Sequence, residues 1–476
     1  MPLSSCRISL CLLLLVAGGA SAQDNRNALN SLAEKIQPDL VTWRRHLHQN
    51  PELGNREIKT AAYIVQQLQG LGLEIRTGIG KTGVLAILRG EKPGPCVALR
   101  ADMDALPVKE RVNLPYASSD STDYGGKKVP VMHACGHDAH VAMLIGAARI
   151  LAPMKKDIRG TIKFIFQPAE EGPPEGEEGG ASLLVKEGIM DNPKVDVVFG
   201  MHIESWIPAG DIQYKPGAFM ASAHQFSVKV KGKSSHGSQP WLGVDPIAVS
   251  AQIIDGFQQI VSRQMDLTKA PVVITVARFN SGIRFNIIPE EANLEGTLRT
   301  LDSKMLEEVQ ARMKQTAAKI AEASNATAEV RFMEKTLVTY NDPKLVETML
   351  PSLQAAAGKE HVRPMEWVTG AEDFSYYGTR APAFFFYFGG MPIGNDPKLA
   401  PPHHTPDFRI DDSRLFIGVR TLCRLAQFEG RQDHRARDRR PADQFDHHLY
   451  RRIVHDRLPI RRQYSGRDGI GSLLVK

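Results

Sequence analysis

The chain has 476 residues, of which 42% are hydrophobic and 24% are charged, as in a globular protein of two or three domains. Its formal net charge of +6 is concentrated in residues 428–476, which hold 12 Lys and Arg against 7 Asp and Glu. The central residues 23–427 are neutral overall, and nothing in them predicts a nucleic-acid-binding surface.

Residues 1–22 have the pattern of a secretory signal peptide. Arg7 is their only charge, Ile8–Val16 form an apolar core, and Ala20-Ser-Ala22 is a small-residue cleavage site. The apolar run is too short to cross a membrane. We therefore expect an exported protein, periplasmic or secreted, that has no membrane segment after cleavage. Two of the five cysteines leave with this peptide, and the odd number that remains argues against a disulfide framework.

The first half of the mature chain predicts an α/β domain. Helices are expected at Asn25–His48 and Lys59–Leu71. Short apolar runs at Cys96–Leu99, Thr161–Phe166 and Val195–Phe199 are typical of buried parallel strands. Their alternation with helices to about residue 210 predicts a mainly parallel sheet.

Residue types that bind metals follow each of these strands. Asp102 and Asp104 follow the first strand, the pair Glu170 and Glu171 the second, and His202 the third. In open α/β sheets, ligands bind outside the carboxyl ends of the strands. Taken alone, each carboxylate could equally be part of a solvated surface turn. Three such strand ends together favour a metal centre.

The segment His133-Ala-Cys-Gly-His-Asp138 strengthens that prediction. Cys135 and His137 place a thiolate and an imidazole two residues apart, just before a helical run at His140–Leu151. These ligands suit a divalent transition metal, although a single Cys-x-His can also be ordinary core packing.

Adjacent Glu170 and Glu171 allow a division of labour, in which one binds metal and the other takes a proton from water. His403 and His404 lie in a Pro-rich loop after the last strand, and we expect one to be a ligand and the other a bystander. His236, in a turn far along the sequence, is by itself predicted to be a surface-turn histidine.

A second pattern begins near Met220. Its elements follow the order β-α-β-β-α-β, which is the ferredoxin-like plan. They are expected at His224–Val230, Pro246–Ser262, Val272–Arg278, Ala292–Arg299, Ser303–Ala323 and Thr327–Phe332. The first domain then resumes with a helix at Asp342–Ala357, a strand at Ala383–Phe388 and a helix at Asp412–Phe428.

The sequence therefore predicts a signal peptide (1–22), a catalytic domain in two parts (23–219 and 333–428) and an inserted domain between them (220–332). Residues 429–476 are rich in Arg, His and Asp and have little helical or strand periodicity. We expect a basic, disordered or out-of-frame tail there, with an anion-binding tail as the alternative.

Nine ordered motifs over about residues 30–427 resemble the aminoacylase and hippurate-hydrolase family of dinuclear metallopeptidases, in particular its auxin-conjugate amidohydrolase branch. The motifs are Arg45-His-Leu-His-Gln-Asn-Pro-Glu52, Arg100-Ala-Asp-Met-Asp-Ala-Leu-Pro107, Met132-His-Ala-Cys-Gly-His-Asp138, Gln167-Pro-Ala-Glu-Glu-Gly172, Gly200-Met-His202, Ser235-His-Gly237, Asn286-Ile-Ile-Pro289, Gly370-Ala-Glu-Asp-Phe374 and His404-Thr-Pro406.

The resemblance implies two divalent metal ions per subunit, zinc, manganese or cobalt, and a role for ten residues. The implied ligands are Cys135, His137, Glu171, His202 and His404. Glu170 would be the general base that activates the water, and Asp104 would orient a ligand histidine. His236 would reach the partner subunit's site in a homodimer and stabilise the oxyanion. Asn286 and Arg299 would bind the substrate carbonyl or carboxylate.

The expected function is hydrolysis of N-acyl or N-aroyl amino acids, which are small-molecule substrates, and the inserted domain would act as a lid and dimerisation domain. Two alternatives stay open. One is a carboxypeptidase or dipeptidase that uses the same metal centre, and the other is a catalytically silent binding protein.

Overall fold

The computed structural model describes residues 28–429. The predicted signal peptide and almost all of the predicted basic tail lie outside this range, so both stay predictions. Within residues 28–429, no helix is both long and apolar enough to cross a membrane.

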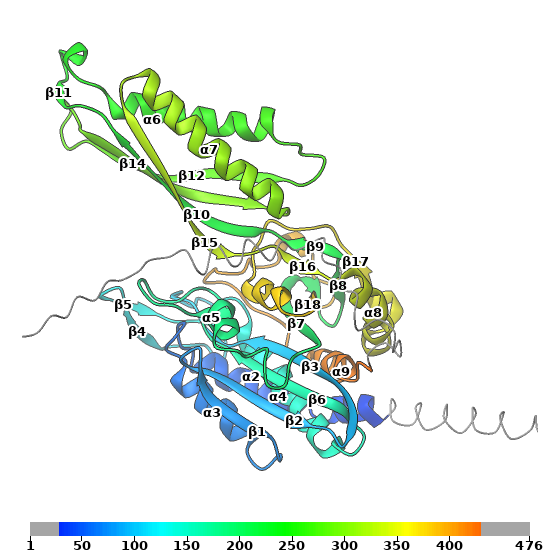
Figure 1. The fold of residues 1–476 in the computed structure, drawn as a ribbon. Coiled ribbons are helices and arrows are strands. Elements are labelled where there is room, and N and C mark those ends of the chain that lie inside the picture. The colour runs from blue at the N-terminus through cyan, green and yellow to red at the C-terminus, as the bar shows by residue number, and fades with distance from the viewer. Residues whose placement is uncertain (1–27, 430–476) are drawn as a thin grey trace, which may run out of the picture. The chain divides into compact units, whose positions relative to one another are not determined.

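An eight-stranded mixed sheet organises the larger domain (Figure 1). Four neighbouring strands at its centre, β6, β3, β7 and β18, are parallel, whereas β1, β2 and β8 pair antiparallel at the sides. In spatial order the strands are β1 (Glu74–Ile79), β2 (Gly83–Arg89), β6 (Arg159–Gln167), β3 (Lys92–Asp102), β7 (Val197–Pro208), β18 (Ala383–Met391), β8 (Ile212–Tyr214) and β17 (Val362–Pro364).

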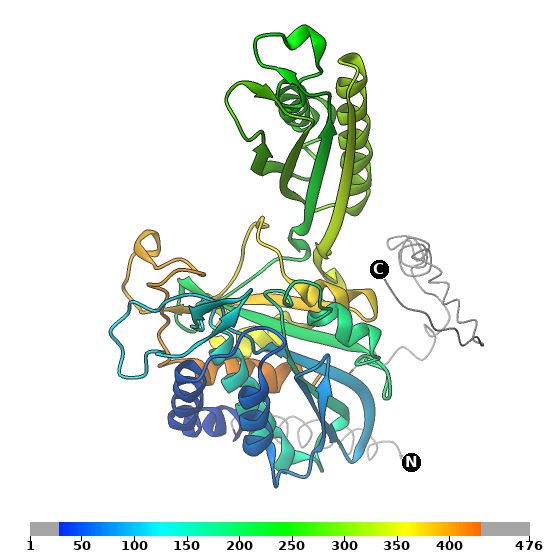
Figure 2. The ribbon, with the colours of Figure 1, turned by 90° about the vertical axis from the view of Figure 1, so that its left-hand side faces the viewer.

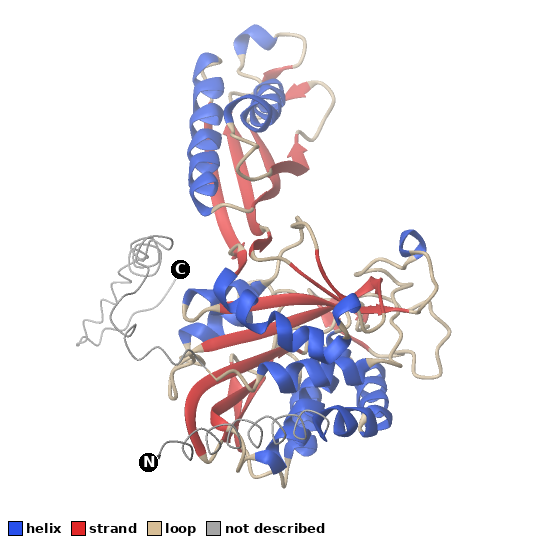
Figure 3. Cartoon of the chain, turned by 90° about the vertical axis from the view of Figure 1, so that its right-hand side faces the viewer, coloured by secondary structure: helices blue, strands red, loops and turns tan. Residues whose placement is uncertain are grey.

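Helices cover both faces of this sheet because its central strands are apolar on both sides. On β3, Val97 and Leu99 belong to one core and Cys96 and Ala98 to the other. The first core also contains residues of α2 (Gln37–Gln49), α3 (Ile58–Leu68), α4 (His137–Leu151), α8 (Pro343–Ala357) and α9 (Leu415–Leu425). The second contains residues of α5 (Gly180–Lys186) and the 3-10 helix η5 (Asp373–Thr379). Figure 3 shows helices beside the strands of the larger domain.

Two details of the sheet differ from the expectation. A hairpin, β1–β2, precedes the parallel strands, because the turn at residues 80–82 joins strands that pair antiparallel. The strand expected to end at Phe199 continues to Pro208. Its pairing with β3 stops at Arg100↔Gly200, and pairing with β18 carries it further. His202 therefore lies within a strand, beyond the last pair with β3.

The inserted elements form a four-stranded antiparallel sheet in the order β12-β14-β10-β15. Its strands are β10 (Ser222–Lys231), β12 (Val272–Ser281), β14 (Glu291–Thr300) and β15 (Thr327–Thr336). The helices α6 (Pro246–Gln259) and α7 (Ser303–Ala323) pack on one face and share a separate apolar core with it (Figures 1 and 2). The ferredoxin-like plan is confirmed, and β15 extends four residues past the expected boundary at 332.

Candidate metal centre

A short loop and the first turn of α4 present Cys135 and His137. Gly136 caps α4 with a φ of +93°, a left-handed conformation that favours glycine. A Cβ atom at this position would lie 2.4 Å from the Ile203 side chain. The loop at Gly136 thus lies close to Ile203 of β7. Cys135 and His137 are buried there, with 7% and 0% of their surfaces exposed.

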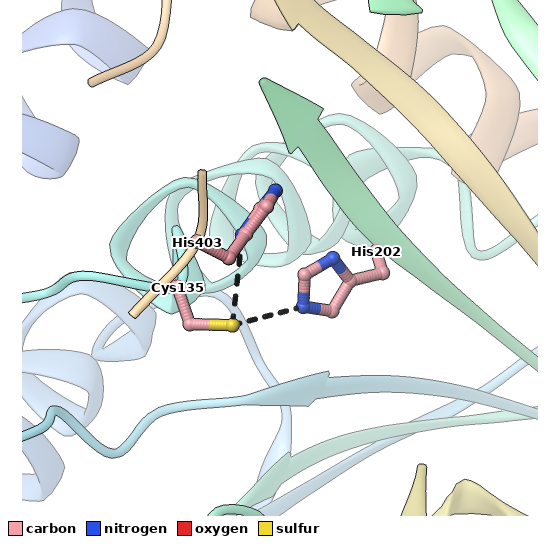
Figure 4. Close-up of side chains that lie close together, drawn as sticks. All are labelled: Cys135, His202 and His403. Atoms are coloured by element: carbon pink, nitrogen blue, oxygen red, sulfur yellow. Dashed lines mark hydrogen bonds between the residues drawn. The ribbon is translucent and has the colours of Figure 1, made fainter. Parts of the chain in front are cut away.

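Cys135 lies at the centre of a group of three histidines. Its Sγ atom is 3.3 Å from His202 Nε2, 3.2 Å from His404 Nε2 and 3.7 Å from His403 Nδ1. Figure 4 shows Cys135 between His202 and His403. The His404 Nε2 atom also lies 2.9 Å from Glu171 Oε1. Four of the five predicted ligands therefore converge here.

His137 is the fifth predicted ligand and is oriented by Asp104. Its Nδ1 atom lies 2.9 Å from the Asp104 carbonyl oxygen and 3.2 Å from Oδ1. This fixes the proton on Nδ1 and leaves the Nε2 lone pair free. Among the described residues, Nε2 has no hydrogen-bond partner, although it is buried. It lies 4.0 Å from Glu170 Oε2.

The site has too little positive charge for its acidic groups. Burial, together with Glu171 and Glu170, raises the pKa of the Cys135 thiol well above its ordinary value. Burial, Glu372 and Glu171 likewise raise the pKa of Glu170 well above its usual range. Bound divalent cations would supply the missing charge and allow the thiolate to form. The donor set of sulfur, imidazole nitrogen and carboxylate oxygen fits such ions.

Glu204 is a carboxylate that the sequence analysis missed. Its Oε1 atom lies 3.3 Å from His202 Nδ1, and its Oε2 atom lies 3.2 Å from His403 Nε2. The Trp206 indole N–H also donates to it, at 2.7 Å. The available signal was spacing, because positions i and i+2 of a strand share a face. Glu204 thus holds His202 and His403, and it is His404, not His403, that contacts Glu171.

His140 is a second residue near the site that the sequence did not single out, and it pairs with Asp102. The His140 Nδ1 atom lies 2.5 Å from Asp102 Oδ1, and its Nε2 accepts from the Ile203 N–H at 2.7 Å. Both ring nitrogens of His140 are therefore occupied by protein groups. Asp102 also accepts from Arg100, at 2.6 Å.

Arg100 is wholly buried and links several strand ends. Its guanidinium donates to Asp102, to Glu372 at 2.9 Å, to Asp373 at 3.0 Å and to Gln167 at 2.8 Å. Ligand-type oxygens of Glu170, Glu372 and Asp373 lie within 4.8 Å of one another. The arginine offsets part of the charge that surrounds Glu170.

The three predicted residues of the inserted domain are not brought to the metal cluster. The ring of exposed His236 contacts Ser238, whose hydroxyl lies 2.7 Å from its Nδ1. Asn286 is close to it, because the Asn286 carbonyl accepts from Gly237 N–H at 2.9 Å. Arg299 donates to the Thr369 carbonyl at 3.3 Å, in the loop that leads to Glu372.

The fold and the site together define a two-domain metallohydrolase. The chain belongs to the family described as peptidase family M20/M25/M40, whose model matches residues 98–427. The predicted family and fold class are thereby confirmed. The family relationship also confirms the predicted class of enzyme, a hydrolase of C–N amide bonds.

Individual relatives agree with this assignment. The chain is 38% identical to thermostable carboxypeptidase 2 of Saccharolobus solfataricus, over 84% of this chain and 97% of the relative. It is 41% identical to the N-acyl-L-amino acid amidohydrolase of Geobacillus stearothermophilus, over 64% and 79% of the two chains. Among solved structures it resembles the YXEP protein of Bacillus subtilis, described as a dinuclear metal-binding peptidase. That match has a TM-score of 0.68 and 34% identity, over 82% and 98% of the two chains.

Proposed function

We propose that this protein hydrolyses the amide bond of N-acyl or N-aroyl amino acids and depends on two divalent metal ions. The observation that carries the proposal is the cluster of Cys135, His137, Glu171, His202 and His404, with the Glu170 carboxylate beside it. A silent binding protein would not need a free carboxylate at this position.

In the proposed reaction, bound metal ions would supply Lewis acidity to the amide carbonyl and to the attacking water. Glu170 takes the proton from that water and gives it to the nitrogen of the departing amino acid. Asp104 keeps His137 in the tautomer that leaves Nε2 free.

We propose zinc, manganese or cobalt as the metal. A thiolate and several imidazoles favour zinc or cobalt, whereas two carboxylates in the same cluster also suit manganese. The test is hydrolysis of acetyl, benzoyl and indole-acetyl amino acids by protein that has been stripped with a chelator and then reloaded with each metal. We expect loss of free amino acid release on chelation and recovery with at least one metal. Absence of turnover with every metal would contradict the proposal.

A carboxypeptidase is the second candidate, because two relatives carry that name. A free dipeptide brings an ammonium group, which needs an unpaired carboxylate nearby. Glu372 and Asp373 lie close to Glu170, but Arg100 already bonds both. We therefore expect N-acylated substrates to be cleaved faster than the same dipeptides with a free amine. The reverse order would favour the peptidase.

The inserted domain supports a proposed homodimer. Its tip exposes large apolar side chains, with Trp241, Ile283 and Phe285 exposed by 75%, 97% and 95%. Apolar groups of this size on a surface indicate a partner. His236 lies in the same region and would act across the interface, while Asn286 and Arg299 would bind substrate. Light scattering of the purified protein tests the dimer, and a monomer at micromolar concentration would contradict it.

Export stays a proposal that rests on residues 1–22. We expect protein fractionated from a bacterial host to be periplasmic or secreted and to begin at Gln23. N-terminal sequencing measures this directly. An intact N-terminus in the cytoplasmic fraction would contradict it.

Glu204→Gln is expected to weaken metal binding. The neutral amide no longer raises the basicity of His202 and His403 as the carboxylate does. Loss of this carboxylate behind the histidines should therefore reduce the affinity for metal about 10–100-fold. Titration with a chelator competitor measures the affinity. Glu360→Gln is the control, because Glu360 is exposed and far in sequence from every predicted ligand. Equal affinity in Glu204→Gln and wild type would show that Glu204 does not tune the site.

A further inference from the structure

Glu57 is a buried carboxylate that has no role in the reaction proposed above. It is the N-cap residue of α3 and is 0% exposed, yet its side chain makes no capping hydrogen bond. Glu52 takes that place, since its Oε2 atom accepts from the Thr60 N–H at 2.9 Å. The helix therefore does not account for a buried charge at Glu57.

The Glu57 side chain instead reaches the turn that carries Glu170 and Glu171. Its Oε1 atom accepts from the Ala169 N–H at 2.9 Å, and its Oε2 atom accepts from the Thr82 hydroxyl at 2.6 Å. Ala169 directly precedes Glu170. The hydrogen bond thus fixes the Pro168–Ala169 peptide, one residue before the proposed base.

Ala169 needs such support because its backbone is strained. Its φ is +52°, in the left-handed region that a residue with a Cβ atom rarely adopts. Strained backbone persists where its surroundings hold it, and it is concentrated at functional sites. The segment before Glu57 also packs on this turn. A Cβ atom at Gly54 would lie 2.9 Å from the Gly172 carbonyl oxygen and 3.1 Å from Ala169 Cα.

We infer that Glu57 is a positioning residue, which holds the strained Ala169 turn so that Glu170 is aimed at the reacting water. This inference rests on the proposed role of Glu170. It assigns a purpose to Glu57, which lies outside the nine sequence motifs.

The test compares four variants with wild type in metal-replete protein. Glu57→Ala removes the acceptor, and a misplacement of the order of 1 Å should lower kcat about 10–100-fold with little change in KM or metal content. Glu57→Gln keeps a carbonyl oxygen for the Ala169 N–H and should retain most activity. Burial and the Asp104 carboxylate raise the pKa of Glu57 to about 7, so a neutral amide is a close substitute.

The double variant Glu57→Ala/Ala169→Gly separates positioning from general stability. Glycine adopts a positive φ without steric cost, so it should recover part of the lost kcat. Glu52→Ala is the matched control, because it removes the Thr60 bond at the same helix start. It should lower the melting temperature and leave kcat unchanged.

Wild-type kcat in Glu57→Ala would overturn the inference, as would a double variant with no recovery. Crystal structures of wild type and Glu57→Ala give a readout that does not need activity. We expect Ala169 to leave the left-handed region and Glu170 to move in the variant, and an unchanged turn would overturn the inference. If wild type cleaves no N-acyl amino acid, the proposed function fails, while these structures still decide whether Glu57 holds the turn.

Discussion

Glu170→Gln is expected to lower kcat about 10²–10⁴-fold while both metal ions remain bound, because loss of a positioned general base has that magnitude. Glutamine has nearly the same shape as glutamate and cannot take a proton from water. Glu171, the predicted ligand, is untouched. Steady-state kinetics on an N-acyl amino acid, together with elemental analysis of bound metal, measure both quantities.

The matched control is Glu175→Gln, a change to an exposed carboxylate in the same loop. It should leave kcat and metal content at wild-type values. A Glu170→Gln protein that is metal-replete and fully active would exclude Glu170 as the base. A loss of metal instead would show that Glu170 is a ligand.

Arg100→Met is expected to lower the free energy of unfolding by ~3–5 kcal/mol, the cost of leaving a buried charge without its partner. Arg100 is fully buried, and its removal strips hydrogen bonds from Asp102, Glu372 and Asp373. Denaturant unfolding of chelator-treated protein measures the loss without interference from bound metal. Arg331→Met breaks an exposed ion pair with Glu329 and should cost at most about 1 kcal/mol.

The loss of unfolding free energy in Arg100→Met should depend on pH. Burial by itself raises the pKa of Asp102, but His137, His140 and Arg100 lower it more, and the pKa lies well below its usual range. A carboxyl group whose pKa is depressed in the folded protein stabilises the fold at pH values above its unfolded-state pKa of about 4. This stabilisation is lost as the pH falls. The difference between wild type and variant should therefore be largest near neutral pH and shrink below about pH 4. A constant difference would mean that packing, not charge, explains the loss.

Much of the site could be predicted because its signals are local. Cys135 and His137 are two residues apart, and Glu170 and Glu171 are adjacent, so residue type and spacing were enough to single them out. The order of helices and strands in the inserted domain was predictable for the same reason, since hydrophobic periodicity is a property of neighbouring residues.

The length of β7 could not be predicted in the same way. His202 was expected after a strand that ends at Phe199, but β18 continues to pair with β7 up to Pro208. Strand length here depends on a partner about 185 residues further along the chain, as in the pair His202↔Tyr387. The antiparallel strands at the sides of the sheet depend on pairing in the same manner.

The sequence by itself determined the family, the two-domain plan and the kind of atoms that could bind metal, because these depend on which residues occur and in what order. The tertiary structure decided which groups meet. It placed Glu204 against two histidines, Arg100 among three carboxylates, and Glu57 against the Ala169 turn. Each of these contacts joins segments whose approach depends on sheet pairing and core packing, and a buried charge is stable only where such packing supplies its partner.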